Sequence, residues 1–357
     1  MDAVKKEAVL ALLKWYDDSA RSLPWRSQPT PYRVWISEIM LQQTQVATVV
    51  PYFERFMAEL PEVSALAEVD EEQLFKLWEG LGYYSRARHL HQAAQQIMER
   101  FEGRVPGTKA ELLTLPGIGE YTAGAIASIA FGQREAAVDG NALRVFARLL
   151  ADSGDISEAK VKKHFQEIIG QWVPNDRPGD FNQSLMELGA RICTPKAVPD
   201  CANCPLGKWC QAYRLGKTAE LPVKAAKKAR QIQKRTVLLV MSEAGKVLLQ
   251  KRPARGLLAG LWEFPSLEGW LTEDELRVWL IQQGFAPKQI WPANSARHIF
   301  THKEWHMQGW AVFVQAAEKE VSGVWATSEQ LQQSYAVPSA YRAYLEQLPV
   351  FLAKMQL

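Results

Sequence analysis

Apolar residues recur every three or four positions along much of the first 215 residues, the spacing that places them on one face of a helix. The pattern is clear in RVWISEIMLQQTQVATVV, residues 33–50, and in EEQLFKLWEGLGYYSRARHLHQAAQQIMERF, residues 71–101. After residue 235 it changes to short apolar runs, TVLLVM, KVLLQK and GWAVFVQA, which are typical of strands. One helical segment, TEDELRVWLIQQG over residues 272–284, lies between them. The sequence therefore predicts an all-helical region followed by an α+β domain.

The segment between these two regions is rich in basic residues. YRLGKTAELPVKAAKKARQIQKR, residues 213–235, contains eight Lys and Arg against one Glu. It is either a solvated tether or a contact for phosphate groups, and the sequence does not separate the two. We predict a helical region over 1–215, a basic linker over 216–235 and a second domain over 236–357.

The length and composition agree with a multidomain globular protein. A chain of 357 residues is too long for one ordinary core and suggests two or three domains. No run of eighteen apolar residues occurs and the first thirty residues lack a signal-peptide pattern, so we expect no membrane partner and a cytoplasmic location. The net charge of +3 is too small to indicate a nucleic-acid partner by itself.

All four cysteines lie in one short segment, CTPKAVPDCANCPLGKWC, residues 193–210. Four clustered thiols with none elsewhere indicate one four-thiolate metal site. Disulfides are the alternative, but they are uncommon in a chain without secretion signals. The spacing does not choose between tetrahedral zinc and a [4Fe-4S] cluster. The expected ligands are Cys193, Cys201, Cys204 and Cys210.

A glycine-rich turn, LPGIG at residues 115–119, precedes a helical run of small residues. Gly117 and Gly119 let backbone amides turn outward, and the N-terminus of the next helix adds a favourable potential for an anion. Phosphate is the natural ligand of such a site, although turns of this kind are as often structural.

Two carboxylates stand in environments that we expect to differ. Asp139 precedes Gly-Asn and a helical run, so it is either a plain N-cap or a carboxylate that the helix dipole keeps ionised beside a cation. Glu38 has Trp35 and Leu41 near it on one helix face, and burial there would raise its pKa. Most helical glutamates are solvated, so Glu38 alone is a weak candidate. Together the two predict an acid and an electrostatic partner.

These motifs together resemble a known family. LPGIG, VDGN at 138–141, the four cysteines and PWR…TPYRVWISEIMLQQTQV resemble the endonuclease III superfamily of helix-hairpin-helix DNA glycosylases. SEIMLQQTQV, GLGYYSRAR and the added C-terminal domain are similar to its A/G-specific adenine glycosylases. The resemblance covers nearly the whole chain and is dense up to about residue 215. One departure is visible, because seven residues separate Cys193 from Cys201 where the family pattern has six.

The resemblance implies a fold, an activity and partners. The fold is a six-helix barrel with an iron-sulfur subdomain, followed by a Nudix-like domain. The activity is monofunctional excision of adenine mispaired with 8-oxoguanine or guanine, by base flipping and hydrolysis of the N-glycosidic bond in base excision repair. Duplex DNA and a [4Fe-4S] cluster are the expected partners, with a monovalent cation at the hairpin. The protein is expected to be a bacterial, nucleoid-associated monomer.

The resemblance also assigns roles to residues. Glu38 would protonate adenine at N7, and Asp139 would stabilise the oxocarbenium-like sugar or trap it covalently, as in retaining glycoside hydrolysis. Tyr121 stands where lyase members carry a Lys, so no imine can form there. The other matches are Gln43 and Tyr83, which would insert into the DNA, and Arg26, Asn141 and Gln183, which would lie near the extruded adenine.

In the second domain, VLLQKRPARGLLAGLWEFPS, residues 247–266, resembles the opening of a Nudix hydrolase fold. DELRVWLIQQG stands where Nudix hydrolases carry their metal-binding carboxylates, so we do not expect nucleotide hydrolysis. Phe300, Thr301 and His302 stand where the family has its 8-oxoguanine-sensing loop. His298, His302 and His306 have the spacing of a helical zinc site, but the residues between them favour strand and turn.

Two other functions and one further partner stay open. Tyr121 and the extra domain disfavour an endonuclease III-like pyrimidine glycosylase and lyase. A non-catalytic mismatch-binding protein would be favoured by Glu38 and Asp139 facing away from a common pocket. QLPVFL, Gln347–Leu352, loosely resembles the peptide by which bacterial repair proteins bind the sliding clamp, although a plain amphipathic terminus also explains it.

Overall fold

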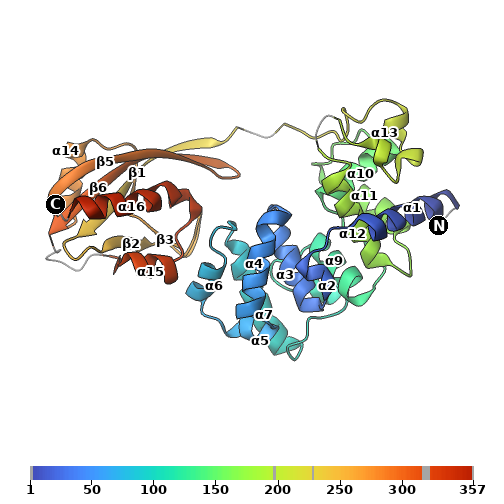
Figure 1. Cartoon of the computed structure of the whole chain (residues 1–357), viewed down its shortest axis with the longest axis horizontal. Helices are drawn as coiled ribbons and strands as arrows, with labels where there is room; N and C mark the ends of the chain where they lie inside the picture. Colours follow the sequence, from blue (N-terminus) through green and yellow to red (C-terminus); the bar gives the residue numbers. More distant parts are fainter. Residues whose placement is uncertain (1–2, 196–197, 227–228, 316–321, 356–357) are drawn as a thin grey trace. The chain divides into compact units, whose positions relative to one another are not determined.

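The computed structural model describes residues 3–195, 198–226, 229–315 and 322–355. The chain forms two compact units, Met1–Val69 with Arg88–Ala226, and Asp70–Ala87 with Lys227–Leu357. Helices build the first unit, and the sheet lies in the second (Figure 1). The change from helices to strands follows the change in the apolar pattern.

The first unit is helical throughout, with two short 3-10 turns in the cysteine segment. Its elements are α1 (Ala3–Ser19), α2 (Pro24–Ser27), α3 (Pro31–Leu41), α4 (Val46–Glu59), α5 (Val63–Glu68), α7 (Ser85–Arg100, whose first residues cluster with the second unit), α8 (Lys109–Leu112), α9 (Glu120–Phe131), α10 (Gly140–Leu150), α11 (Ala159–Trp172), α12 (Pro178–Arg191), η1 (Cys201–Asn203), η2 (Gly207–Trp209) and α13 (Gln211–Arg214).

Helix α12 packs against α1, α9 and α10. Its Phe181 and Leu188 lie in one core cluster with Phe146 of α10. Small residues let α12 and α9 approach closely, because a Cβ atom on Gly179 would lie 2.7 Å from the carbonyl oxygen of Ser128. This packing fixes α9, which carries Tyr121, and α12, which carries Gln183 and Glu187.

The described strands of the second unit form a seven-stranded mixed sheet with the order β3-β2-β1-β6-β5, where β4 also pairs with β1 and β7 with β2. Strands β1 and β6 are parallel, and the other pairs are antiparallel. The strands are β1 (Gln231–Ser242), β2 (Val247–Lys251), β3 (Trp262–Glu263), β4 (Ser266–Glu268), β5 (Ala286–Ile299), β6 (Lys303–Gln315) and β7 (Val324–Ala326).

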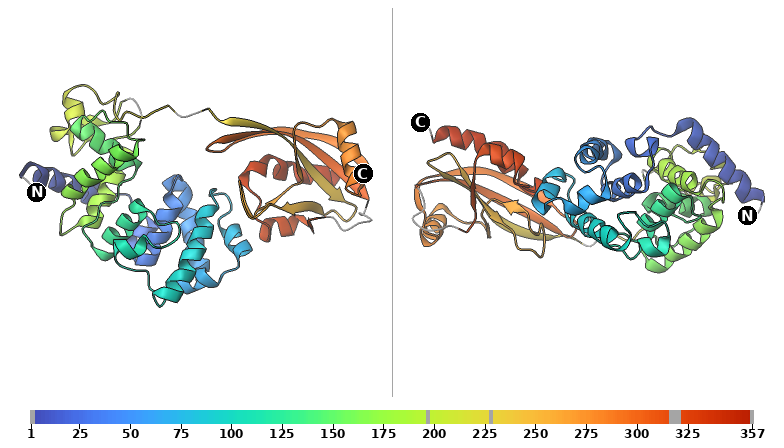
Figure 2. Two further views of the ribbon diagram at one scale, coloured as in Figure 1. Left: turned by 180° about the vertical axis from the view of Figure 1, so that it is seen from behind. Right: turned by 90° about the horizontal axis from the view of Figure 1, so that it is seen from below.

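Helices cover both faces of this sheet (Figures 1 and 2). Helix α14 (Glu273–Gln282), which the sequence predicts, clusters with Val240, and α16 (Arg342–Lys354) clusters with Leu239 on the other face. Successive residues of a strand point to opposite faces, so the continuous apolar run in β1 is buried on both sides. The remaining elements of the unit are α6 (Glu71–Leu77), α15 (Ser328–Gln333) and η3 (Ser339–Tyr341).

Two features of the second unit differ from the sequence analysis. Strand β1 begins at Gln231, so the end of the range predicted as a linker is strand, because Gln231–Arg235 pair with the start of β6. Most of strand β5 was not predicted: the sequence indicates strand only around His298, and the part before it contains Pro287 and Pro292. It lies at the edge of the sheet, where the missing N–H of proline is tolerated.

The segment Gln347–Leu352 lies inside α16 rather than in a free tail. Leu348 and Phe351 are buried in the core cluster of the sheet, and Oε1 of Gln347 accepts a hydrogen bond from the backbone of Asn294 at 2.8 Å. These contacts occupy the side chains that a clamp-binding peptide would offer.

Among the described helices, none is long and apolar enough to cross a membrane.

Candidate active site

Glu38 is buried on helix α3, where only 5% of the residue is exposed. The helix begins at Pro31, and Oγ1 of Thr30 caps it by accepting a hydrogen bond from the backbone of Arg33 at 3.3 Å. Burial is the main cause that raises the pKa of Glu38 to about 7, and the nearby Asp139 raises it further. At neutral pH a large fraction of this carboxyl therefore holds a proton, as expected from its partly apolar helix face.

Tyr121 is the direct hydrogen-bond partner of Glu38. Its hydroxyl, in the first turn of α9, donates to Oε2 of Glu38 at 2.5 Å, and the Sδ of Met186 lies 3.5 Å from the same hydroxyl oxygen. Burial, with the negative charges of Glu38 and Asp139, raises the pKa of Tyr121 well above its ordinary value. The phenol therefore stays protonated and acts as a donor.

Asp139 is the N-cap of α10, as the sequence predicts. Its Oδ1 accepts from the backbone of Ala142 at 2.8 Å, and its Oδ2 accepts from Nδ2 of Asn141 at 2.6 Å. Burial raises the pKa of Asp139, against these hydrogen bonds and the charge of Arg144, which lower it. The influences expected from the sequence, capping and the helix dipole, keep this carboxylate ionised, whereas burial, which acts in the opposite direction, is the larger one.

Arg144 joins this cap to the start of the cysteine segment. Its Nη2 donates to Oδ1 of Asn141 and to the carbonyl of Gly189, both at 2.8 Å, and its Nε donates to the carbonyl of Cys193 at 2.7 Å. A Cβ atom on Gly189 would lie 2.5 Å from the Cβ of Asn141, so only glycine permits this approach. Arg144 could not be predicted from the sequence, since an arginine on a helix gives no signal of its partners.

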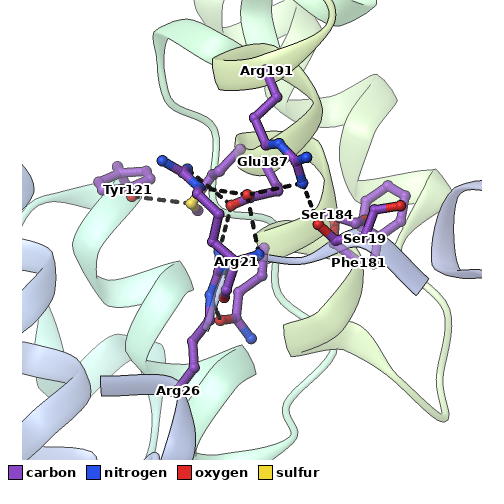
Figure 3. Close-up of polar contacts among 10 residues, drawn as sticks. Ser19, Arg21, Arg26, Tyr121, Phe181, Ser184, Glu187 and Arg191 are labelled. Carbon is purple, nitrogen blue, oxygen red and sulfur yellow. Dashed lines mark hydrogen bonds and ion pairs between the residues drawn. The ribbon is translucent and has the colours of Figure 1, made fainter. Parts of the chain in front are cut away.

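Arg26 and Gln183 meet at the N-terminal part of α12. Nε of Arg26 donates to Oε1 of Gln183 at 3.1 Å, and Nη2 donates to Oε2 of Glu187 at 3.0 Å. Figure 3 shows Glu187 of α12 between Arg21, Arg26 and Arg191. Tyr121 appears beside α12 in the same view. Arg26 also lowers the pKa of Glu38, so its positive charge acts on the candidate acid. Sequence reasoning missed Glu187 because a helical glutamate is usually solvated.

The glycine-rich turn forms the hairpin before α9. Gly117 has φ +76°, and a Cβ atom there would lie 2.7 Å from the Cβ of His89, so another residue would be strained. Gly119 is the N-cap of α9, with open space around the position of a Cβ atom. Gly117 and Gly119 are exposed, so this turn lies at the surface beside the N-terminus of α9, the part of a helix that favours an anion.

The two residues expected to insert into DNA have unusual backbone conformations. Gln43 has φ +59° and Tyr83 has φ +47°, and residues other than glycine rarely adopt this left-handed region. Each is exposed at a turn of its own unit. Strain of this kind is held in place only by the surrounding structure and is frequent at ligand contacts. The sequence gives no sign of it, because neither residue is glycine.

Phe300, Thr301 and His302 form the turn between β5 and β6. The centroids of the Phe300 and Trp305 rings lie 4.8 Å apart. Thr301 and His302 are exposed at the tip of the turn. The Thr301 hydroxyl lies 3.1 Å from the hydroxyl of Tyr83, within the second unit. His298 and His306 lie in strands, as the sequence analysis expects.

The four cysteines line a single pocket beside α10 and α12. Nη1 of Arg148 lies 3.3 Å from Sγ of Cys193, and Nε of the same side chain donates to the carbonyl of Leu221 at 2.8 Å. Four thiols with an adjacent guanidinium are a donor set that fits a thiolate-bound cluster. No three His, Cys, Asp or Glu side chains of the described ranges converge as a site for a single metal ion.

The first unit therefore brings Glu38, Tyr121 and Asp139 into mutual electrostatic contact, with Asn141 bonded to Asp139 and with Arg26 acting on Glu38. The alternative of a non-catalytic mismatch-binding protein would be favoured by Glu38 and Asp139 facing away from a common pocket, whereas here Asp139 acts electrostatically on both Glu38 and Tyr121.

Comparison with known proteins agrees with this site. Residues 36–171 match the HhH-GPD superfamily of base excision DNA repair proteins, and residues 236–347 match a NUDIX domain. The chain is 37% identical to the adenine DNA glycosylase of Mus musculus, over 93% of this chain and 77% of the mouse protein. It is 35% identical to that of Buchnera aphidicola subsp. Baizongia pistaciae, over 82% of each chain. The chain belongs to the adenine DNA glycosylase family. It is therefore an N-glycosylase of base excision repair.

A solved structure supports the fold of the helical part of the chain. The structure of a thermostable thymine-DNA glycosylase is 29% identical, with a TM-score of 0.55, over 60% of this chain and all of that chain. The agreement covers the helical part of the chain and confirms the all-helical fold class predicted for it.

Proposed function

We propose that the chain excises adenine opposite 8-oxoguanine or guanine in duplex DNA and leaves an abasic site. The observation that carries this proposal is a buried Glu38 with a pKa near 7, bonded to Tyr121 and within the electrostatic influence of Asp139. An acid that is still partly protonated at neutral pH suits protonation of a leaving base.

In this reaction protonated Glu38 transfers its proton to N7 of the flipped adenine. The N9–C1′ bond breaks, and its electron pair goes to the purine. The carboxylate of Asp139 stabilises the positive sugar that forms. Water then adds to C1′ and passes a proton to the ionised Glu38, which restores the acid.

The enzyme acts as a glycosylase without lyase activity. Imine formation needs an amine at the sugar, and Tyr121 offers a phenol instead. The Tyr121 hydroxyl instead donates a hydrogen bond to Glu38 and so stabilises the carboxylate that remains after proton transfer.

Duplex DNA would be held and opened by several parts of the chain. The amides at Gly117 and Gly119 suit a backbone phosphate, and Gln43 and Tyr83 would fill the space left by the flipped base. Thr301 and His302 would contact the nucleobase opposite the adenine, and the packed Phe300 ring would hold their loop in place. Asn141 and Gln183 can form hydrogen bonds with the extruded adenine.

Cys193, Cys201, Cys204 and Cys210 would hold a [4Fe-4S] cluster, which would cross-link the segment that follows α12. The pocket that they share and the Arg148 guanidinium support this assignment. Through Arg144, the backbone of Cys193 is tied to Asn141, so the cysteine segment also supports the position of the Asp139 cap.

Other parts of the proposal rest on the sequence. These are a catalytic range 1–215, a linker that begins at residue 216 and ends before β1, a recognition range that includes 236–357, a monomeric and nucleoid-associated state in a bacterial cytoplasm, and a monovalent cation at the hairpin. Contact with a sliding clamp through Gln347–Leu352 also stays a prediction, and it would require the C-terminal part of α16 to open.

Replacing Glu38 by Gln tests the chemical proposal. The amide keeps the shape of the side chain and has no acidic proton, so the variant should bind the mispair and lose excision in single-turnover assays. Glu59→Gln is a matched control, because Glu59 is exposed at the end of α4. Excision by Glu38→Gln at a rate close to that of the control would remove Glu38 from the mechanism.

A further inference from the structure

Glu187 is a fully buried carboxylate that the proposed reaction does not use. Its Oε1 accepts from Nε of Arg21 at 2.6 Å, and its Oε2 accepts from Nη2 of Arg21 and Nη2 of Arg26, both at 3.0 Å (Figure 3). Nη1 of Arg191 lies 3.8 Å away. A buried charge is retained at a cost unless it is paired, and here three guanidinium groups surround it.

The guanidinium of Arg26 is fixed at three of its donors. Besides the bond to Glu187, Nη1 donates to the carbonyl of Arg21 at 3.0 Å and Nε donates to Oε1 of Gln183 at 3.1 Å. Arginine has five N–H donors and no acceptor. Among the residues that the structure describes, no acceptor contacts the other two donors, which remain for a ligand in a plane that Glu187 and Arg21 hold in place.

This anchoring determines which way the amide of Gln183 points. Because Arg26 can only donate, Gln183 must turn its oxygen toward Arg26 and its NH₂ group away from it. Gln183 and Glu187 are four residues apart on α12 and so share one face of the helix. In the described part of the chain, no acceptor contacts Nε2 of Gln183. Arg26 and Gln183 together offer N–H donors to a ligand.

We propose that Glu187 is a positioning residue that sets the hydrogen-bond polarity of the adenine pocket by holding Arg26 and, through it, Gln183 as donors. The inference rests on the proposed placement of Arg26 and Gln183 beside the flipped base. Since Glu38 protonates N7, the donors would read another ring nitrogen, N1 or N3, as an acceptor. At N1 guanine carries a hydrogen, so a donor directed there would exclude guanine.

The test pairs protein variants with base analogues. Single-turnover excision is measured on duplexes with 8-oxoguanine opposite adenine, 1-deazaadenine or 3-deazaadenine, each analogue lacking one ring acceptor. In the wild type, one analogue should be cleaved about tenfold more slowly than adenine, the size expected for one lost hydrogen bond. Glu187→Gln leaves one acceptor oxygen for two arginines, so it should cleave adenine more slowly. The tenfold difference in rate between adenine and that analogue should disappear in this variant.

Asp180→Asn is the matched control. Asp180 lies on the same helix and pairs with Arg177 at 2.7 Å, without a contact to Arg26, so this variant should keep the tenfold difference. If Glu187→Gln does not fold, as judged by its thermal transition, Glu187→Asp takes its place. Aspartate keeps the buried charge but is one methylene shorter, and it too should lose the difference.

The outcomes separate this inference from the proposed function. A folded Glu187 variant that retains the wild-type difference would overturn the positioning role. A wild type that cleaves both analogues as fast as adenine would also overturn it, while leaving adenine excision intact. Failure of the wild type to release adenine from any of these duplexes would instead overturn the proposed function.

Discussion

The hydrogen bond from Tyr121 to Glu38 makes a direct prediction about pH. Glu38 must be protonated to act as an acid, so the excision rate should fall as the pH rises through its pKa of about 7. The Tyr121 hydroxyl, 2.5 Å from Oε2, stabilises the ionised carboxylate and lowers this pKa. In Tyr121→Phe that donor is lost. The pKa of Glu38 should therefore rise, and the alkaline limb of the rate profile should move to higher pH.

The size of this shift follows from the energy of the bond. A hydrogen bond to a charged group contributes about 1.5–3 kcal/mol, and one pKa unit corresponds to about 1.4 kcal/mol. The midpoint should thus rise by about one to two units, whatever happens to the maximal rate. Tyr32→Phe is the matched control, because the buried Tyr32 hydroxyl on the same helix bonds to the carbonyl of Leu60 at 2.9 Å and not to Glu38. Single-turnover rates across the pH range measure the midpoint. A Tyr121→Phe midpoint equal to or below that of the control would refute the reasoning.

Three further predictions follow from the other parts of the chain. Purified protein should contain about four iron atoms per chain and absorb visible light, because four thiolates without His suit iron and sulfide; one zinc atom per colourless, active chain would contradict this. The double variant Thr301→Ala, His302→Ala should lower the preference for 8-oxoguanine over guanine by about fivefold or more, since each base contact contributes about 1–3 kcal/mol. The control Glu243→Ala, which removes an exposed ion pair with Lys288, should keep this preference. Borohydride should trap no adduct with the wild type but some with Tyr121→Lys, and efficient trapping by the wild type would reveal another amine.

The parts of the site that follow from local sequence could be predicted. Asp139 precedes a helical run, and a side-chain oxygen there caps the helix in the structure. Glu38 shares a helix face with apolar residues, so its burial and raised pKa follow from periodicity. The helix start at Gly119 follows from the glycine-rich turn.

The parts that depend on distant pairing could not be predicted. Glu187 meets Arg21 and Arg26 across more than 160 positions of sequence, and nothing on α12 alone distinguishes it from a solvated glutamate. Arg144 is similar, since its partners are backbone carbonyls that only the fold brings together. Most of strand β5 could not be predicted, because proline disfavours strands in general and is tolerated here only by the position of β5 at the edge of the sheet.

Base release from three duplexes tests the central claim most directly. The wild-type chain is incubated with adenine opposite 8-oxoguanine, adenine opposite guanine, and thymine glycol opposite adenine, and the strands are resolved with and without alkali. We predict that the strand carrying the mispaired adenine breaks in the first two duplexes only after alkali, and that the thymine glycol strand stays intact. Breakage of the thymine glycol strand without alkali, with the adenine strands intact, would contradict the account.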